Sequence, residues 1–311
     1  MKYRPKHIVE YVLLRIISGL VNLLPYRGAL AVGWMLAGFA FYVCQFRRSE
    51  TIRRMRSVFG DRFSTPEYHR MAWTCCRNLM FHVIEILRSK KTTLEWCNQH
   101  FEYAETIKTL KQQVASGTGA VIATSHTGNW DLGAFAIAQN EIPLLVVVAK
   151  QRNPLVNAYF DRIRSAPFMT SLTRGKPGVL KGIVTHLRNG NMLGIVPDAR
   201  MKTPDLEMPF LGGNANLGAG MASFARMVGV PIILVIVDRI GWTKHRIRIF
   251  QKVEPNLTLD KQTDIHRMTA IVLDHINREI RTAPEQWFWY NKRWILDPVK
   301  QDLKRTEQEL S

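Results

Sequence analysis

The sequence predicts an α/β protein with a mostly parallel central sheet flanked by helices, preceded by an N-terminal hydrophobic helical segment associated with a membrane. Short apolar runs alternate with amphipathic segments from Gly119 onward, which is the pattern of a parallel sheet covered by helices. Residues 28–46 contain no charged residue. The 311 residues, 46% of them hydrophobic, suit two average domains or one α/β domain with an appended segment.

Residues 1–46 form the predicted membrane-associated segment. Residues 28–46 are long enough to cross a bilayer core, whereas residues 7–25 are apolar but contain Glu10 and Arg15. No small-residue cleavage site follows, so a cleaved signal peptide is not expected. Basic residues flank the run on both sides, so a hairpin or an interfacial helix pair would keep both flanks on the cytoplasmic face. The alternative is a buried core helix of a soluble protein.

Residues 47–297 form the predicted α/β domain. It begins with a helical lead-in over residues 47 to about 100, in which residues 68–88 have apolar positions at helical spacing. Residues 245–250 alternate with period two and predict a strand near an edge, and residues 264–282 predict an amphipathic helix. Residues 298–311 form a charged C-terminal tail. The remaining predicted strands are 120–125, 144–149, 169–173, 191–198 and 231–239, and the amphipathic segments between them are 131–139, 153–164, 177–190 and 215–229.

The net charge of +18 favours an anionic partner, such as nucleic acid, an anionic membrane surface or an acidic protein. The four cysteines have no zinc-binding spacing, so they predict reduced, inert thiols in a reducing compartment. No metal site and no cofactor are expected.

The stretch "VIATSHTGNWDLGAF" places His126 at the end of a predicted strand, where open α/β sheets bind ligands. Gly128 permits a tight turn, and Asp131 in the first helical turn is expected to reach back to the imidazole. A carboxylate on one ring nitrogen fixes the tautomer and leaves the other nitrogen to accept a proton. No Ser or Cys stands in a nucleophile elbow, so the nucleophile would be the substrate's own hydroxyl. The alternative is a capping histidine followed by an ordinary aspartate of a first helical turn.

Four ordered motifs resemble the late acyltransferases of lipid A biosynthesis, the lauroyl/myristoyl group within the glycerolipid acyltransferase-like superfamily. The resemblance extends from the hydrophobic segment to about Asp297. The motifs are "SHTGNWD"; "NPLVNAYFDRIR" with the following "SLTRGKPGVLKGIVTHLRNG"; the Pro-Asp and Pro-Phe blocks of residues 196–233; and "APEQWFWYNKRW". The tryptophans of the last motif are interpreted as core residues.

The resemblance implies transfer of an acyl chain from a thioester on acyl carrier protein to a hydroxyl of a lipid A precursor. It implies an enzyme of the inner (cytoplasmic) membrane with its catalytic domain facing the cytoplasm. His126 would be the general base and Asp131 its orienting carboxylate. The arginines are candidates for phosphate or carboxylate contacts, with solvated helix charge as the alternative. The predicted substrate-binding residues are Asn129, Arg162, Arg164, Arg174 and Asp198.

Three other functions fit parts of the pattern. One is acylation of another glycolipid or of a phospholipid, with coenzyme A as a possible carrier of the donor chain. The high charge also suits a nucleic-acid-binding protein, but no binding motif is present and the hydrophobic N-terminus does not fit. The third is a membrane-bound adaptor that has lost activity, against which stands the retention of His126, Asp131 and Asp198.

Overall fold

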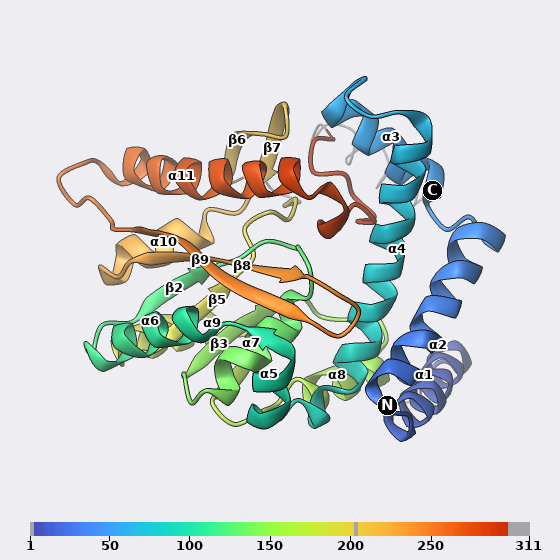
Figure 1. Cartoon of the computed structure of the whole chain (residues 1–311). Helices are drawn as coiled ribbons and strands as arrows, with labels where there is room; N and C mark the ends of the chain where they lie inside the picture. The colour runs from blue at the N-terminus through green and yellow to red at the C-terminus, as the bar shows by residue number, and fades with distance from the viewer. Residues whose placement is uncertain (1–2, 202–204, 298–311) are drawn as a thin grey trace.

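The computed structural model describes residues 3–201 and 205–297, and a seven-stranded sheet lies at its centre (Figure 1). Neighbouring strands are parallel except for the antiparallel pair β8–β9. The predicted class, an α/β fold with a mostly parallel sheet, is therefore confirmed. In spatial order the strands are β1 (Phe101–Glu102), β9 (His245–Val253), β8 (Ile232–Arg239), β2 (Ala120–Ala123), β5 (Met192–Ile195), β3 (Leu144–Val148) and β4 (Met169–Thr173).

Both faces of the sheet are buried, which explains why its central strands are continuous apolar runs. In β8, Ile233, Val235 and Val237 point into one core cluster, and the alternating residues 232, 234 and 236 point into the other. The first cluster contains side chains of α5 (Leu94–His100), α6 (Ala104–Ala115) and α7 (Trp130–Gln139). The second contains side chains of α9 (Val179–Arg188), α10 (Gly220–Val228) and α11 (Lys261–Thr282).

The segment 215–229 differs from the amphipathic helix expected there. Its first residues form β7 (Gly213–Leu217), which pairs with β6 (Leu206–Phe210) in an antiparallel hairpin outside the main sheet. Leu211 and Gly212 have φ values of 52° and 84°, as a two-residue hairpin turn requires. The helix begins only at Gly220 because Ala215 and Leu217 are buried as alternate strand residues.

The helical lead-in supplies the element that closes the sheet at one end. It contains α3 (Arg48–Phe59), α4 (Thr65–Leu87) and the one-turn η2 (Ser89–Lys91). Helix α4 starts with a capping box between Ser64 and Glu67 and runs along the edge where the parallel strands end (Figure 1). Helix α8 (Pro154–Ile163) lies between β3 and β4 in the chain.

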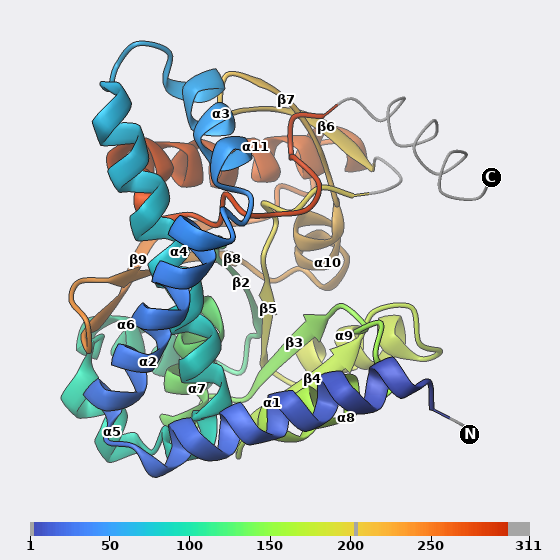
Figure 2. The same ribbon diagram turned by 90° about the vertical axis from the view of Figure 1, so that its right-hand side faces the viewer.

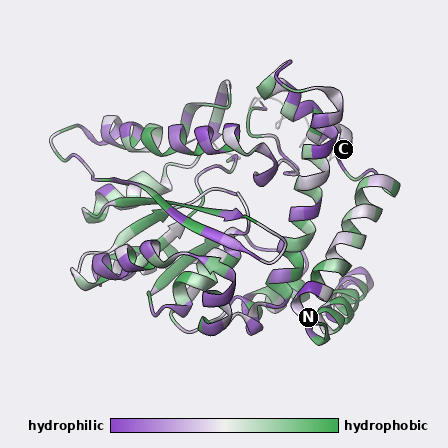
Figure 3. Ribbon diagram, viewed as in Figure 1, coloured by the Kyte–Doolittle hydropathy of each residue, from purple (hydrophilic) through white to green (hydrophobic). Residues whose placement is uncertain are grey.

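The hydrophobic N-terminal segment folds as α1 (Pro5–Leu23), α2 (Tyr26–Gly38) and the π-helical turn η1 (Phe39–Val43). Its inner side chains share one core cluster with α4 and α8, and α1 runs beside α8 in Figure 2. Within the described ranges no single helix is long and apolar enough to cross a membrane, although Tyr26–Val43 together with Arg48–Phe59, bent by 85°, meets the length and composition test. Figure 3 shows that much of the ribbon of α1 and α2 has the colour of hydrophobic residues. Many large apolar side chains of these helices are exposed: Ile8, Val9, Val12, Leu13, Ile16, Leu20, Leu23, Trp34, Met35, Leu36, Phe39, Tyr42 and Val43.

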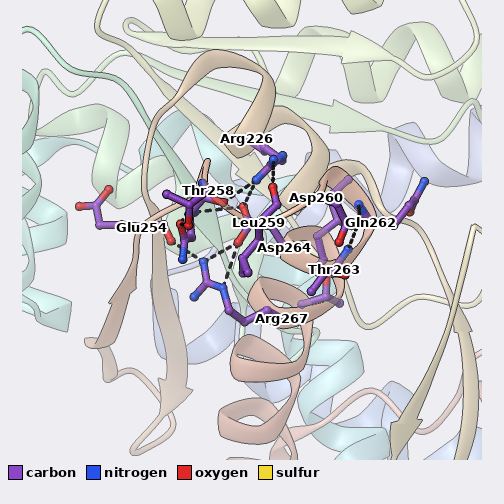
Figure 4. A network of polar contacts seen from close by, with 12 residues as sticks. Arg226, Glu254, Thr258, Leu259, Asp260, Gln262, Thr263, Asp264 and Arg267 are labelled. Atoms are coloured by element: carbon purple, nitrogen blue, oxygen red, sulfur yellow. Dashed lines mark hydrogen bonds and ion pairs between the residues drawn. The ribbon is translucent and has the colours of Figure 1, made fainter.

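Helix α11 carries the chain toward the edge where the parallel strands end, and a buried carboxylate fixes its start (Figure 4). Asp264 is fully buried and accepts hydrogen bonds from Arg226 of α10 (2.6 Å) and from Arg267 (2.6 Å). These charge-assisted bonds tie α10 to the first turns of α11. The last turn of α11 leads into η3 (Pro284–Gln286), whose following residues reach the candidate site.

Candidate active site

The loop that joins β2 to α7 carries His126 at the carboxyl end of a central strand. Two backbone hydrogen bonds hold this loop against residues 286–288: Gly128 N–H donates to Gln286 O (2.9 Å), and Phe288 N–H donates to His126 O (2.9 Å). Gly128 has φ +55°, and a Cβ atom there would overlap with the carbonyl oxygen of Val237. A glycine is therefore required by both the backbone conformation and the close approach of β8.

The carboxylate of Asp198 is bonded to His126 twice. Oδ1 accepts from the ring Nδ1 (2.7 Å), and Oδ2 accepts from the backbone N–H of His126 (2.8 Å). The indole Nε1–H of Trp287 donates a third bond, to Oδ2 (2.7 Å). Asp198 is 1% exposed, so its carboxylate is shielded from solvent and is held by His126 and Trp287. Among the described residues none bonds to Nε2 of His126, and this nitrogen is open to solvent.

This geometry corrects the partner that the sequence predicted for His126. Asp131 was expected to reach back to the imidazole, but its Oδ2 accepts from His82 Nε2 (3.2 Å) and from Arg164 Nη2 (3.5 Å). Asp198, predicted to contact substrate, is the carboxylate that orients the ring. The reason is topological. Strands β2 and β5 are parallel neighbours, so His126 and Asp198, which follow them, lie at the same edge of the sheet. Asp131 instead faces α4 and bonds to His82 of that helix.

The paired charges change the pKa values of this site. Burial alone lowers the pKa of His126, but the charge of Asp198, its hydrogen bond and the nearby charge of Asp131 together raise it above its ordinary value. For Asp198, burial opposes ionisation, yet His126 and Trp287 hold the pKa below its usual range. For Asp131, burial again opposes ionisation, and His82 and Arg164 lower the pKa to about 2. Both carboxylates are ionised at neutral pH.

Aromatic rings connect the two histidines. The ring of Trp130 lies 4.1 Å from that of His82 and 4.7 Å from that of His126 (centroid distances). Phe288 packs against Trp130 at 6.0 Å. The motif tryptophans Trp287 and Trp289 are buried, as expected, but Trp287 also supplies a hydrogen-bond donor to the site.

Asn129 has a different position from the one predicted for a substrate contact. Its side chain is fully buried: Oδ1 accepts from Leu132 N–H (3.0 Å) at the start of α7, and Nδ2 donates to Glu85 (2.6 Å). In this arrangement the side chain anchors the loop and has no surface open to a substrate. Glu85 is itself buried and paired with Arg239, so a charged network supports the loop from below.

The structure separates the three predicted arginines. Arg164 is 15% exposed in its side chain and bonds to Asp131, so it belongs to the site. Arg162 is exposed over the ring of Tyr159, on the flank of α8. Arg174 is exposed beyond β4, where it contacts the sulfur of Met201 (3.3 Å).

The sequence reasoning missed His82, Glu85 and Trp287. His82 and Glu85 interrupt the apolar stretch "LMFHVIEIL" of α4, and buried polar residues at that spacing are a usable signal. In the part of the chain that the structure describes, no group of three or more His, Cys, Asp or Glu side chains is placed to hold a metal ion. The expected absence of a metal or cofactor remains a prediction.

Known proteins that are similar to this chain are acyltransferases. The family model of bacterial lipid A biosynthesis acyltransferases matches residues 3–295. A phosphatidylinositol mannoside acyltransferase of Mycolicibacterium smegmatis is 23% identical over 186 residues, which are 58% of this chain and 59% of that protein. One of Mycobacterium tuberculosis is 25% identical over 191 residues, 60% of this chain and 58% of the relative. A lipid A biosynthesis palmitoleoyltransferase of Escherichia coli is 22% identical over 262 residues, which are 81% of this chain and 80% of that protein.

Proposed function

This chain belongs to the family of bacterial lipid A biosynthesis acyltransferases, and we propose that it transfers a fatty acyl chain from a thioester to a hydroxyl of a glycolipid. The observation that best supports this reaction is the His126–Asp198 pair, because it leaves Nε2 without a hydrogen-bond partner among the described residues, at the carboxyl edge of the sheet. A general base needs an oriented ring with one nitrogen free for the proton of the attacking group.

In the proposed reaction the acceptor hydroxyl oxygen attacks the thioester carbonyl carbon while its proton moves to Nε2 of His126. Asp198 holds Nδ1 and stabilises the imidazolium that results. The tetrahedral intermediate collapses with cleavage of the C–S bond, and the imidazolium returns the proton to the leaving sulfur. The products are an ester and a thiol. We assign no step to a metal or cofactor.

Acyl carrier protein is the proposed donor, with coenzyme A as the alternative. The carrier protein is acidic, and the net charge of +18 on this chain favours its association electrostatically. The same charge favours anionic lipid, so charge alone does not distinguish the two donors.

The proposed acceptor is a lipid A precursor, and the alternative is another glycolipid or a phospholipid. The relatives include proteins named for lipid A and for phosphatidylinositol mannoside. Arg164 lies at the site, and Arg174 and Arg162 are exposed, so all three remain candidates for contacts with acceptor phosphate.

We also propose that the protein binds the inner membrane with its catalytic domain on the cytoplasmic side. The helices α1 and α2, with their exposed apolar side chains, also contain the exposed basic residues Lys6, Arg15 and Arg27, and the exposed Arg4 directly precedes α1. Basic side chains near an anionic surface each contribute about 1 kcal/mol to binding. Fractionation in high salt tests this proposal, and recovery of the full-length protein wholly in the soluble fraction without detergent contradicts it.

The proposed reaction is tested with purified protein, lauroyl-acyl carrier protein or lauroyl-coenzyme A, and two acceptors, a lipid A precursor and phosphatidylinositol mannoside. We expect an acylated glycolipid that mass spectrometry detects and that His126→Ala does not form. Absence of product with every donor–acceptor pair, from protein that is folded and bound to detergent micelles, contradicts the proposal. Product from His126→Ala at the wild-type rate contradicts the general-base mechanism.

A further inference from the structure

The two oxygens of the Asp131 carboxylate have different surroundings. Oδ2 accepts from His82 Nε2 (3.2 Å) and from Arg164 Nη2 (3.5 Å). Oδ1 has no hydrogen-bond partner among residues 3–201 and 205–297, and it is open to solvent in a side chain that is 20% exposed. One oxygen is thus held by the protein and the other is available.

The held oxygen belongs to a rigid assembly. His82 is 5% exposed on α4, and its ring packs on Trp130, whose own ring packs on His126. Arg164 reaches the same oxygen from the end of α8, with its guanidinium over the ring of Phe160 at 5.2 Å. Asp131 therefore lies beside the proposed base, close enough for its charge to raise the pKa of His126, yet without a bond to that ring.

We propose that Asp131 is a substrate contact, in which Oδ1 accepts a hydrogen bond from a second hydroxyl of the acceptor sugar, next to the hydroxyl that attacks. His82 and Arg164 are positioning residues that hold Oδ2 in place. This proposal rests on the proposed function, since it concerns the acceptor of that reaction. A carboxylate only accepts hydrogen bonds, and sugars carry neighbouring hydroxyl donors. With Asp198 already occupying Nδ1, the orientation of His126 needs no second carboxylate.

Two reactions of one enzyme separate a contact with the acceptor from an effect on the base. In acyl transfer the nucleophile is the sugar hydroxyl, whereas in hydrolysis without acceptor the nucleophile is water. Both need His126, but only transfer uses a second sugar hydroxyl. The experiment measures both rates with lauroyl-coenzyme A as donor and a lipid A precursor as acceptor, and it compares their ratio between variants.

For Asp131→Asn we expect the ratio of transfer to hydrolysis to fall about 10- to 100-fold, mainly through a higher KM for the acceptor, because a charge-assisted bond is lost. The matched variant Asp198→Asn is expected to lower both rates together and to leave the ratio within about threefold of wild type. If Asp131→Asn also lowers both rates together, or changes neither, the proposal is overturned.

The positioning role has its own pair of variants. His82→Phe keeps an aromatic ring against Trp130 but removes the donor to Oδ2, and His82→Gln restores an N–H donor. We expect His82→Phe to lower the transfer-to-hydrolysis ratio at least about fivefold and His82→Gln to recover most of it. Equal ratios in the two variants would show that His82 only packs. These variants also keep the test valid if Asp131→Asn does not fold. A wild-type protein that neither transfers nor hydrolyses would contradict the proposed function itself.

Discussion

Asp198→Asn tests the assignment of the orienting carboxylate with almost no change in shape. Asp198 accepts two bonds at Oδ2, from the His126 backbone N–H (2.8 Å) and from Trp287 Nε1 (2.7 Å), and one at Oδ1, from His126 Nδ1 (2.7 Å). The amide oxygen of Asn can take the place of Oδ2 and keep the two bonds from the His126 backbone N–H and Trp287 Nε1. Its NH₂ group then faces Nδ1 and can only donate, which forces the ring into the tautomer with the proton on Nε2. That tautomer cannot accept a proton from the acceptor hydroxyl.

The expected loss follows from this change of tautomer. General-base assistance contributes about 10²–10⁴-fold, so kcat should fall by that factor. Two of the three bonds remain and the third reverses its direction, so the loss of stability should not exceed about 3 kcal/mol, the upper value for one hydrogen bond to a charged group. The pH profile should change as well. Wild-type activity needs neutral His126 and rises with pH through its raised pKa, and removal of the Asp198 charge should move this limb to lower pH.

The assay is transfer of a labelled acyl chain to the acceptor over a range of pH, with a melting curve for each variant. Asp274→Asn is the control for the chemical change, since Asp274 is an exposed α11 residue paired with Arg278 on the helix surface. A kcat for Asp198→Asn within tenfold of wild type, in folded protein, would refute the role of Asp198. A wild-type activity that does not rise with pH on the acid side would refute the claim that His126 must lose its proton before it can act.

Three further predictions follow from the geometry. Gly128→Ala should disorder the loop and lower kcat at least about tenfold, because its Cβ would overlap with Val237 O; the melting temperature should change less than kcat. Glu85→Gln should cost about 3–5 kcal/mol in urea unfolding, because Arg239 is left buried without its charge partner, whereas exposed Glu95→Gln should cost almost nothing. The free energy of unfolding should fall as pH drops from about 4 toward about 2, because the pKa of Asp131 is about 2 in the folded protein and about 3.9 in the unfolded chain. Asp131→Asn should lessen this loss.

Each of these predictions can fail in a definite way. Normal turnover of Gly128→Ala would show that β8 yields to the added methyl group. Equal unfolding free energies for Glu85→Gln and Glu95→Gln would show that the buried pair contributes no net stability. If the free energy of unfolding falls equally with pH in wild type and Asp131→Asn, the loss of stability in acid comes from other carboxylates.

Sequence periodicity predicted the sheet well because strands buried on both faces are short apolar runs between amphipathic segments. Strands 144–149 and 231–239 were placed within one residue of β3 (Leu144–Val148) and β8 (Ile232–Arg239). The β6–β7 hairpin was missed since its turn, Leu211-Gly212, lacks the usual Asn-Gly or Asp-Gly signal. The charge-free run 28–46 predicts a stretch long enough to cross a bilayer core; in the structure α2 and η1 follow each other from Tyr26 to Val43, and the chain bends by 85° before α3.

The site could be predicted only in part. A strand followed by His126 and a glycine indicates a ligand-binding edge, and the structure places His126 there. The partner of His126 could not be found from local spacing, because Asp198 is 72 residues away and is brought near by the pairing of β2 with β5. Asp131 is near in sequence but is drawn away by His82 on α4, a contact between residues 49 apart.

Helix α4 links the proposed membrane-binding helices to the site. His82 and Glu85 are three residues apart on one face of α4, and they bond to Asp131 and Asn129 at the start of α7. Elsewhere on α4, Ile84 lies so close to Gly33 of α2 that a Cβ there would be 3.0 Å from it. Helix α4 therefore packs against α2 and also bonds to Asn129 and Asp131, the two residues on either side of Trp130. The hydrophobic helices are thus connected to the candidate site through direct contacts with α4.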